Sequence, residues 1–416
     1  MSNSKATEFN PSRRNLLVGT SAIAGVASLG APYVARAQGA KKAIKVSVGR
    51  IPWAAANSPV TQYMIEHKLF EKRASELGYD VTIDWRNYPT AIPMVEAIVG
   101  NNLDMGMWGN TPVIRAVSQK LPISLMAVGE GHQRLVIATR KGSPIRTIED
   151  LKGKIVGTLF GGDPYNAFTQ ILRYELGSAN PKDHGIKMVN LPTLAQAGQV
   201  PTGVDATCAF YPSYLAAQPT GTVGIANSFG YTEDYYEGPL GKGSGILIPS
   251  VKKSPFYPEG YYLHRSFWVL NNRLAEKDPK VVVAFIMAME DAVVVLSAMD
   301  PGAVSQLVKK YWKLDATAGA KVVKEDVLFK RGWCWATEND ARAVLEVSKQ
   351  LVASKILDQP LTWAQVKGSF EQTAPLAKEA YARMGSKPSE AEFMRTDTGD
   401  LRGRPMWEIS NWTEHG

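Results

Sequence analysis

The fold is decided by the stretch Leu103-Asp104-Met105-Gly106-Met107-Trp108-Gly109-Asn110-Thr111-Pro112. Its first half is a short apolar run, which is typical of a buried strand. Its second half has a hydroxyl side chain followed by proline, the pattern that starts a helix. The chain therefore turns directly from a strand into a helix. This corner is the repeating unit of an α/β domain with a mostly parallel sheet.

The same unit recurs on both sides of this stretch. Apolar or alternating runs predict strands at residues 44–48, 81–85, 103–108, 135–139, 154–159, 204–210 and 267–270. Beyond residue 270 the pattern becomes helical only, with helices expected at residues 281–299, 340–354 and 363–384. The first of these is almost entirely apolar, but Glu290 and Asp291 interrupt it, so we interpret it as a buried helix and not a membrane span.

Three strand-to-helix corners share one sequence pattern, a short polar side chain followed by proline. They are Asn57-Ser58-Pro59, Asn110-Thr111-Pro112 and Gly162-Asp163-Pro164. Ser58 and Thr111 are expected to cap their helices. In a parallel sheet such corners meet at the carboxyl ends of the strands, where ligands bind. Free N–H groups at the helix N-termini attract anions. Ordinary capping explains any one corner, whereas three corners beside Trp53, Trp108 and Tyr165 predict a binding cleft.

The first 37 residues have the three parts of an export signal. Arg13-Arg14 precedes a weakly hydrophobic run at residues 16–31, and the segment ends on Ala35-Arg36-Ala37, a small-x-small cleavage site. We expect a twin-arginine signal peptide, cleavage after Ala37 and a periplasmic mature protein. An N-terminal anchor is the alternative, but the run is shorter than the ~20 residues that a span needs.

The composition excludes several classes of function. Of the 416 residues, 45% are hydrophobic and 21% are charged, as in ordinary two-domain globular proteins. The net charge of +8 is scattered, which does not favour nucleic acid but favours anionic small molecules. Cys208 and Cys334 are expected to be buried and unpaired. The five histidines lie far apart without metal-ligand spacing, so neither a metal nor a cofactor is expected.

From about residue 46 to residue 312, the chain resembles the periplasmic solute-binding proteins of ABC importers in the nitrate, sulfonate and taurine group, which also includes binders of pyrimidine precursors of thiamin. The similarity is carried by residues 101–112, residues 143–157 with Leu151-Lys152-Gly153-Lys154, Gly203-Val204-Asp205-Ala206 followed by Tyr211-Pro212, Phe267-x-Val269-x-Asn271 and Asp278-Pro279. The chain departs from the group's pattern at Tyr211, at residues 161–164 and in a tail beyond Met384.

This resemblance implies a bilobal, type II-like periplasmic binding protein. Two α/β lobes with parallel or mixed sheets would be joined by hinge strands and close on a ligand, and an all-helical extension would follow. We expect lobe one at residues 41–139 and 265–416, and lobe two at residues 140–264. The implied function is to deliver a small organic anion, either a sulfonate or an aromatic or aliphatic carboxylate, to an inner-membrane permease and ATPase. The protein is expected to be a monomer and not an enzyme.

The resemblance and the corners together suggest which residues face the ligand. Aromatic walls are expected from Trp53, Tyr88, Trp108, Tyr165 and Tyr211, and polar contacts from Asn57, Ser58, Asn110, Thr111, Arg134 and Asp163. Core packing is the alternative for each aromatic residue, and a surface position is the alternative for Arg134. Other functions stay open: binding of a pyrimidine-type thiamin precursor, a sensory binding protein, or an enzyme on the same scaffold, for which no motif appears.

Overall fold

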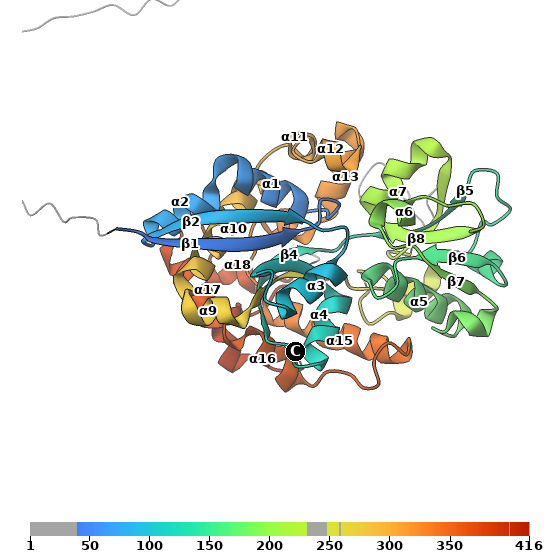
Figure 1. Ribbon diagram of the computed structural model, residues 1–416. Coiled ribbons are helices and arrows are strands. Elements are labelled where there is room, and N and C mark those ends of the chain that lie inside the picture. Colours follow the sequence, from blue (N-terminus) through green and yellow to red (C-terminus); the bar gives the residue numbers. More distant parts are fainter. Residues whose placement is uncertain (1–39, 231–247, 258, 399, 416) are drawn as a thin grey trace, which may run out of the picture. The chain divides into compact units, whose positions relative to one another are not determined.

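The computed structural model describes residues 40–230, 248–257, 259–398 and 400–415. These residues form two five-stranded mixed sheets with helices packed on them (Figure 1). The predicted α/β class with mixed sheets and a helical C-terminal region is therefore confirmed. The expected export signal lies outside the described residues.

The first sheet has the strand order β2-β1-β3-β10-β4. Its strands are β1 (Lys42–Arg50), β2 (Tyr79–Asn87), β3 (Met105–Gly109), β4 (Ile123–Gly131) and β10 (Arg265–Asn271). The first three strands are parallel, and β10 runs antiparallel to both β3 and β4, with Phe267 opposite Trp108. The sequence patterns did not predict β4.

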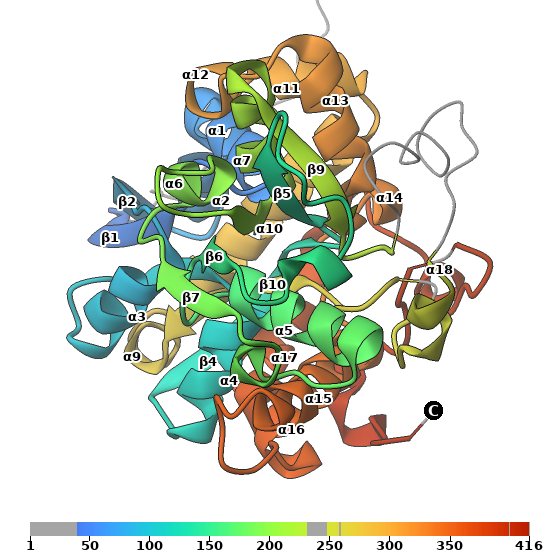
Figure 2. The ribbon, with the colours of Figure 1, turned by 90° about the vertical axis from the view of Figure 1, so that its right-hand side faces the viewer.

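The second sheet has the order β7-β6-β8-β5-β9. Its strands are β5 (Leu135–Arg140), β6 (Ile155–Thr158), β7 (Lys187–Asn190), β8 (Ala206–Phe210) and β9 (Thr222–Asn227). Strand β5 runs antiparallel to both β8 and β9, and Figure 2 shows it beside β9. The lobe boundaries remain a prediction, but the pairing of β5 favours a boundary before residue 135 and not after residue 139.

The chain passes from β4 to β5 through residues 132–134, and it returns to the first sheet immediately before β10. These two crossings touch, because the amide of His132 donates to the carbonyl oxygen of His264 at 2.9 Å. His132 has a left-handed backbone with φ 55°. The crossings bring the carboxyl ends of strands from both sheets into one neighbourhood.

The helices next to these strand ends are α1 (Asn57–His67), α2 (Leu69–Glu76), α3 (Ala91–Val99), α4 (Asn110–Ser118), α5 (Asp163–Leu176), α6 (Leu194–Gly198) and α7 (Tyr211–Ala217). Short 3-10 helices are η1 (Glu149–Leu151), η2 (Pro181–His184), η3 (Gln218–Thr220), η5 (Pro249–Lys253) and η6 (Met406–Asn411). Helix α4 follows β3 of the first sheet and α5 follows β6 of the second, and the starts of the two helices lie next to each other (Figure 1).

The C-terminal helices are α9 (Asn272–Lys277), α10 (Pro279–Ser297), α11 (Pro301–Gln306), α12 (Lys309–Trp312), α13 (Ala316–Glu325), α14 (Val327–Arg331), α15 (Glu338–Ala353), α16 (Trp363–Glu371), α17 (Ala374–Arg383) and α18 (Glu390–Phe393). The prediction of one helix at residues 363–384 is wrong. It is two helices, because Pro375 cannot continue an α-helix and instead lies in the first turn of α17.

Helix α10 is buried, as predicted. Its acidic residue Glu290 is fully buried but accepts hydrogen bonds from the amide of Cys334 at 2.8 Å and from Nε1 of Trp335 at 2.9 Å. Burial raises the pKa of Glu290 to about 7. Among the described residues, no helix is long and apolar enough to cross a membrane.

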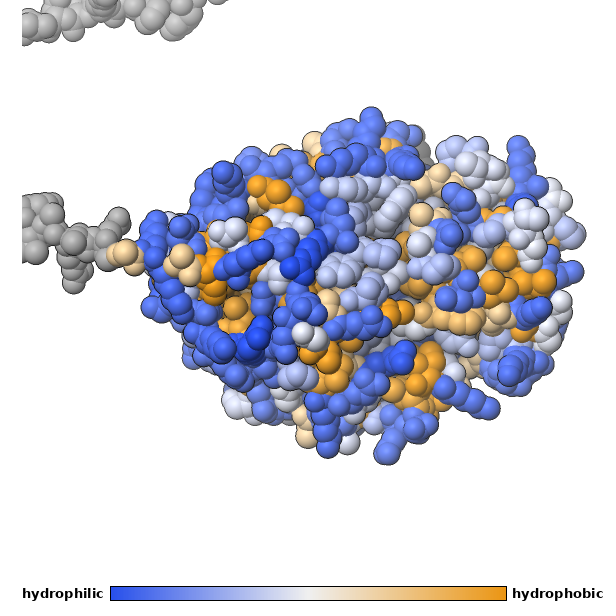
Figure 3. All heavy atoms as spheres, in the orientation of Figure 1, coloured by the Kyte–Doolittle hydropathy of each residue, from blue (hydrophilic) through white to orange (hydrophobic). Residues whose placement is uncertain are grey.

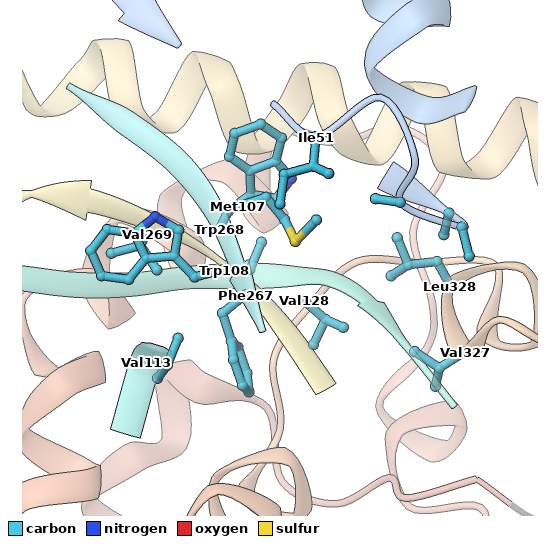
Figure 4. Close-up of a cluster of buried hydrophobic side chains, with 14 of the residues drawn as sticks. Ile51, Met107, Trp108, Val113, Val128, Phe267, Trp268, Val269, Val327 and Leu328 are labelled. Atoms are coloured by element: carbon cyan, nitrogen blue, oxygen red, sulfur yellow. The ribbon is translucent and has the colours of Figure 1, made fainter. Parts of the chain in front are cut away.

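The core of the first sheet surrounds Trp108. This residue is fully buried and lies among Phe267, Trp268 and Val269 (Figure 4).

The face in Figure 3 is mostly hydrophilic, with small hydrophobic patches. Cys208 in β8 and Cys334 before α15 are both buried and free. The described tail packs on the core, since Phe393 and Trp407 lie edge to face at 5.4 Å.

Candidate ligand-binding pocket

A pocket of about 520 Å³, which includes the open solvent at its mouth, lies where strands of both sheets end. The first sheet contributes residues that follow β1 and β2, residues in and after β3, and Glu130 of β4 and Ser266 of β10. The second sheet contributes residues that follow β6 and β7 and the last residue of β8. The crossing from β4 to β5 contributes Gln133. The complete lining is Ile51, Trp53, Ala54, Thr90, Ala91, Ile92, Met107, Gly109, Pro112, Glu130, Gln133, Leu159, Gly161, Gly162, Asp163, Leu194, Phe210 and Ser266.

Two of the predicted site residues, Trp53 and Asp163, line this pocket. Trp53 is half-buried in the turn after β1, and Asp163 is buried as the first residue of α5. The other predicted residues are outside the lining. They are Asn57, Ser58, Asn110, Thr111, Trp108, Arg134 and Tyr211, which are buried, and Tyr88 and Tyr165, which are half-buried.

The predicted hydroxyl caps are wrong. Helices α1 and α4 begin two residues earlier than expected and α5 begins one residue earlier, so their N-caps are Ala56, Gly109 and Gly162, and none makes a side-chain capping bond. Ser58 thus falls on the second helical residue, where its hydroxyl donates to the carbonyl oxygen of Ile51 at 3.0 Å. The amides at these helix starts need other acceptors.

At α4 the acceptor is the carboxylate of Asp163. Its Oδ1 accepts from the amide of Thr111 at 2.9 Å, from Oγ1 of Thr111 at 2.8 Å and from Oη of Tyr262 at 2.6 Å. The approach requires glycine at position 109, because a Cβ there would lie 1.8 Å from Oδ2 of Asp163. The anion-binding site that was predicted at the N-terminus of α4 is therefore occupied by a carboxylate of the chain itself.

Arg134 and Tyr211 form a buried pair beside the pocket. The guanidinium of Arg134 lies 3.9 Å from the centroid of the Tyr211 ring and makes an ion pair with Glu325. The amide of Tyr211 donates to the carbonyl oxygen of Arg134 at 3.0 Å. Gln133, which precedes Arg134 in the crossing from β4 to β5, lines the pocket. The predicted ligand contacts of Arg134 and Tyr211 stay predictions.

The acidic side chains in the pocket lining are Glu130 and Asp163. Burial, together with the nearby carboxylates of Asp326 and Asp163, raises the pKa of Glu130 to about 8. Burial lowers the pKa of His264 to about 4, so this histidine is neutral at neutral pH. Its Nε2 lies 3.8 Å from Oδ2 of Asp163 and 3.9 Å from Oε1 of Glu130.

Sequence reasoning missed Glu130, Gln133, Phe210 and Ser266 as pocket residues. The signal for Glu130 is present, because Gly129-Glu130-Gly131 closes an apolar run at residues 123–128. A carboxylate between two glycines at the end of an apolar run is a different signal from the Gly162-Asp163-Pro164 corner that singled out Asp163. It was not used because that run was not predicted to be a strand.

The comparisons with known proteins agree with this geometry. Residues 53–188 match the family model "ABC transporter, phosphonate, periplasmic substrate-binding protein". The putative aliphatic sulfonates-binding protein of Escherichia coli (strain K12) is 31% identical over 161 residues, which are 38% of this chain and 48% of that protein. The predicted resemblance to periplasmic substrate-binding proteins of ABC importers is confirmed.

A second relative and a solved structure are similar to the chain as well. The taurine-binding periplasmic protein of the same strain is 25% identical over 223 residues, which are 53% of this chain and 58% of that protein. The chain thus spans about half the length of the curated relatives it matches. The alkanesulfonate-binding protein of Xanthomonas axonopodis pv. citri, bound to MOPS, has a TM-score of 0.55 at 16% identity, covering 80% of this chain and 99% of that one. This likeness shows the periplasmic binding protein fold.

Proposed function

We propose that this chain is the periplasmic substrate-binding component of an ABC importer. It would capture a small organic ligand in the pocket and deliver it to an inner-membrane permease and ATPase, without changing the ligand chemically. The observation that carries the proposal is the pocket itself, which draws its lining from strand ends of both sheets and from the crossing between β4 and β5. A ligand that contacts both sides stabilises the arrangement in which they meet.

The pocket favours a ligand with an organic body. Trp53 and Phe210 present aromatic surface from opposite sheets, and Met107, Leu159 and Ile92 add aliphatic surface. Apolar walls with a few polar groups are typical of small-molecule sites. A bare inorganic ion would make no favourable contact with these apolar walls.

An acidic group on the ligand, as predicted from the sequence, remains part of the proposal. Two relatives support it, because one is a putative aliphatic sulfonates-binding protein and the other is a taurine-binding protein. Since Asp163 already accepts a hydrogen bond from the amide of Thr111 at the start of α4, we place the acidic group at α5. Gly161 and Gly162 at its start line the pocket, and this N-terminus has no side-chain cap. The buried Nε2 of Gln133, which has no hydrogen-bond partner among the described residues, offers a second donor.

A thermal-shift screen tests this function. The purified protein is heated with sulfonates, aryl and alkyl carboxylates, and pyrimidines. A ligand at 100 times its Kd should stabilise the protein by ~2.7 kcal/mol. The shift should shrink in Trp53→Ala and persist in Tyr165→Ala, whose ring lies outside the pocket. A screen in which no small molecule raises the melting temperature would contradict the proposal.

Localisation is tested separately. We propose export to the periplasm by the twin-arginine route, on the basis of Arg13 and Arg14. Changing both to lysine should leave unprocessed precursor in the cytoplasm, whereas Lys5→Ala should be exported normally. Mature protein that begins near Gln38 and still reaches the periplasm in the double variant would contradict this route.

A further inference from the structure

We propose that Glu130 is a specificity-determining residue of the pocket, whose neutral carboxyl group donates a hydrogen bond to an oxygen of the ligand's acidic group. This inference rests on the proposed function and deepens it, because it names a side chain of the first sheet that recognises the acid. A buried carboxyl group can stay neutral at pH 7 and serve as a hydrogen-bond donor. Glu130 then admits an anion only while it holds its proton.

The pocket offers an anion no side-chain cation. No lysine or arginine of the described residues lines it, and burial lowers the pKa of His264 to about 4, so that ring is neutral at neutral pH. Asp163 already contributes one acidic side chain, whose Oδ1 accepts three hydrogen bonds within the protein. An ionised Glu130 would put a second buried carboxylate near the ligand's acidic group, and unpaired buried charges are costly. An anion therefore binds best when Glu130 is neutral.

Glu130 is buried against groups from several parts of the chain. The titratable groups around it are Asp326 before α14, Asp163 on α5 and His264 before β10, and the cations Arg265 and Lys330 interact with Asp326. Burial, followed by the two carboxylates, raises the pKa of Glu130 to about 8, although the backbone of Ala55 and the hydroxyl of Ser266 oppose the rise. The side chain is thus mostly neutral at pH 7.

The contacts of Asp326 explain why the proton stays on Glu130. The carboxylate of Asp326 accepts hydrogen bonds from the amide of Gly131 at 3.1 Å and from the amide of Leu328 at 2.8 Å. These amides favour its charged form, so that its pKa, which burial raises, is about 7. Asp326 therefore ionises before Glu130, and the negative charge on Asp326 disfavours a second one on Glu130.

The carboxyl group of Glu130 has an oxygen that is not engaged within the described chain. Its Oε1 accepts from Oγ of Ser266 at 3.4 Å, whereas its buried Oε2 has no hydrogen-bond partner among the described residues. Nε2 of His264 lies 3.9 Å from Oε1, which is too far for a hydrogen bond. Nε2 of Gln133, in the same lining, is also buried and lacks a partner among those residues. Buried polar groups ordinarily have partners, and the oxygens of a carboxylate or sulfonate supply acceptors to both donors.

Calorimetric titration at pH 6.5 and at pH 9 tests the inference. The probes are propanesulfonate, 4-methylbenzoate and the tightest acid of the thermal-shift screen, all of which are ionised at both pH values, so a change in affinity reflects the protein. About a tenth of Glu130 is still neutral at pH 9, so the affinity of the wild type should fall about tenfold from pH 6.5. Titrations in two buffers of different ionisation enthalpy should show about one proton taken up per ligand at pH 9 and almost none at pH 6.5.

Two variants separate Glu130 from other titrating groups. Glu130→Gln keeps the shape and a neutral donor but cannot ionise, so it should bind with similar affinity at both pH values and take up no proton at pH 9. Glu371→Gln, which changes an exposed carboxylate on α16, should behave like the wild type. If Glu130→Gln does not fold, as judged by circular dichroism, the proton uptake of the wild type decides.

Three outcomes overturn the inference while the proposed function stands. They are wild-type affinity for the acids that is independent of pH, the same loss of affinity in Glu130→Gln as in the wild type, and a wider screen in which only neutral compounds bind. If no compound in the screen binds at all, the proposed function fails with the inference.

Discussion

The amide of Thr111 donates to Oδ1 of Asp163 at 2.9 Å, so a carboxylate on the first helix of the second sheet caps a helix of the first sheet. This contact replaces the bound anion that the helix start was predicted to hold. It also couples two segments that are 52 residues apart in the chain. A carboxylate of the protein itself, that of Asp163, therefore forms part of the pocket wall.

The capping contact should contribute measurably to stability. Asp163→Ala leaves the buried amide of Thr111 without its acceptor, and we expect the free energy of unfolding in urea to fall by about 1–3 kcal/mol. Thr111→Val removes the hydroxyl donor at similar volume. Because the two residues share one contact, the double variant should lose less than the sum of the single losses. Strict additivity would contradict the coupling.

Trp53 and Trp108 should respond oppositely to truncation. Trp53 lines the pocket and is half-buried, so Trp53→Ala should weaken an aryl ligand while leaving the melting temperature nearly unchanged. Trp108 is fully buried in the first sheet, so Trp108→Ala should destabilise the protein by about 3–5 kcal/mol. Calorimetry and thermal unfolding of both variants check this. Unfolding of Trp53→Ala with ligand affinity retained would assign Trp53 to the core.

Local patterns predicted most of the fold. Period-2 alternation marks β1, and the apolar run after Pro279 marks α10, because each pattern depends on neighbouring residues only. Strand β4 was missed because it is buried along its whole length, and a short continuous apolar run does not distinguish a strand from a buried helix. The break between α16 and α17 had a visible signal in Pro375.

The site was predicted less completely, for a physical reason. Trp53 and Asp163 lie at strand ends, so a rule about corners finds them. Glu130 and Ser266 reach the pocket because β4 pairs with β10, more than a hundred residues away, and no local pattern encodes that pairing. Trp108 was misleading for the same reason, because the neighbours that bury it, such as Phe267 opposite it in β10, lie far along the chain.

Stability should fall at high pH because of Glu130. Its pKa is about 8 in the folded protein and 4.5 ordinarily, so the folded state holds a proton that the unfolded state releases between these values. The stabilisation is fully present below pH 4.5 and is lost as pH rises through 8. Urea unfolding should show a smaller loss from pH 6.5 to 9 in Glu130→Gln than in the wild type. Equal losses would show that Glu130 is ionised at neutral pH.

Both thiols should be inert in the folded protein. Cys208 and Cys334 are buried and free, and burial raises the pKa of each thiol above its usual range, which disfavours the reactive thiolate. A thiol reagent should therefore titrate two thiols in denaturant and almost none under native conditions. Finding no thiol in denaturant would reveal a disulfide and contradict the structure.

A crystal structure with the tightest ligand from the screen tests the central claim most directly. We predict that the ligand lies in the pocket between the two sheets, with its body against Trp53 and Phe210 and its acidic group at the start of α5. A ligand bound elsewhere, such as the groove lined by Tyr257, Arg342 and Leu401, with the pocket empty, would contradict the account.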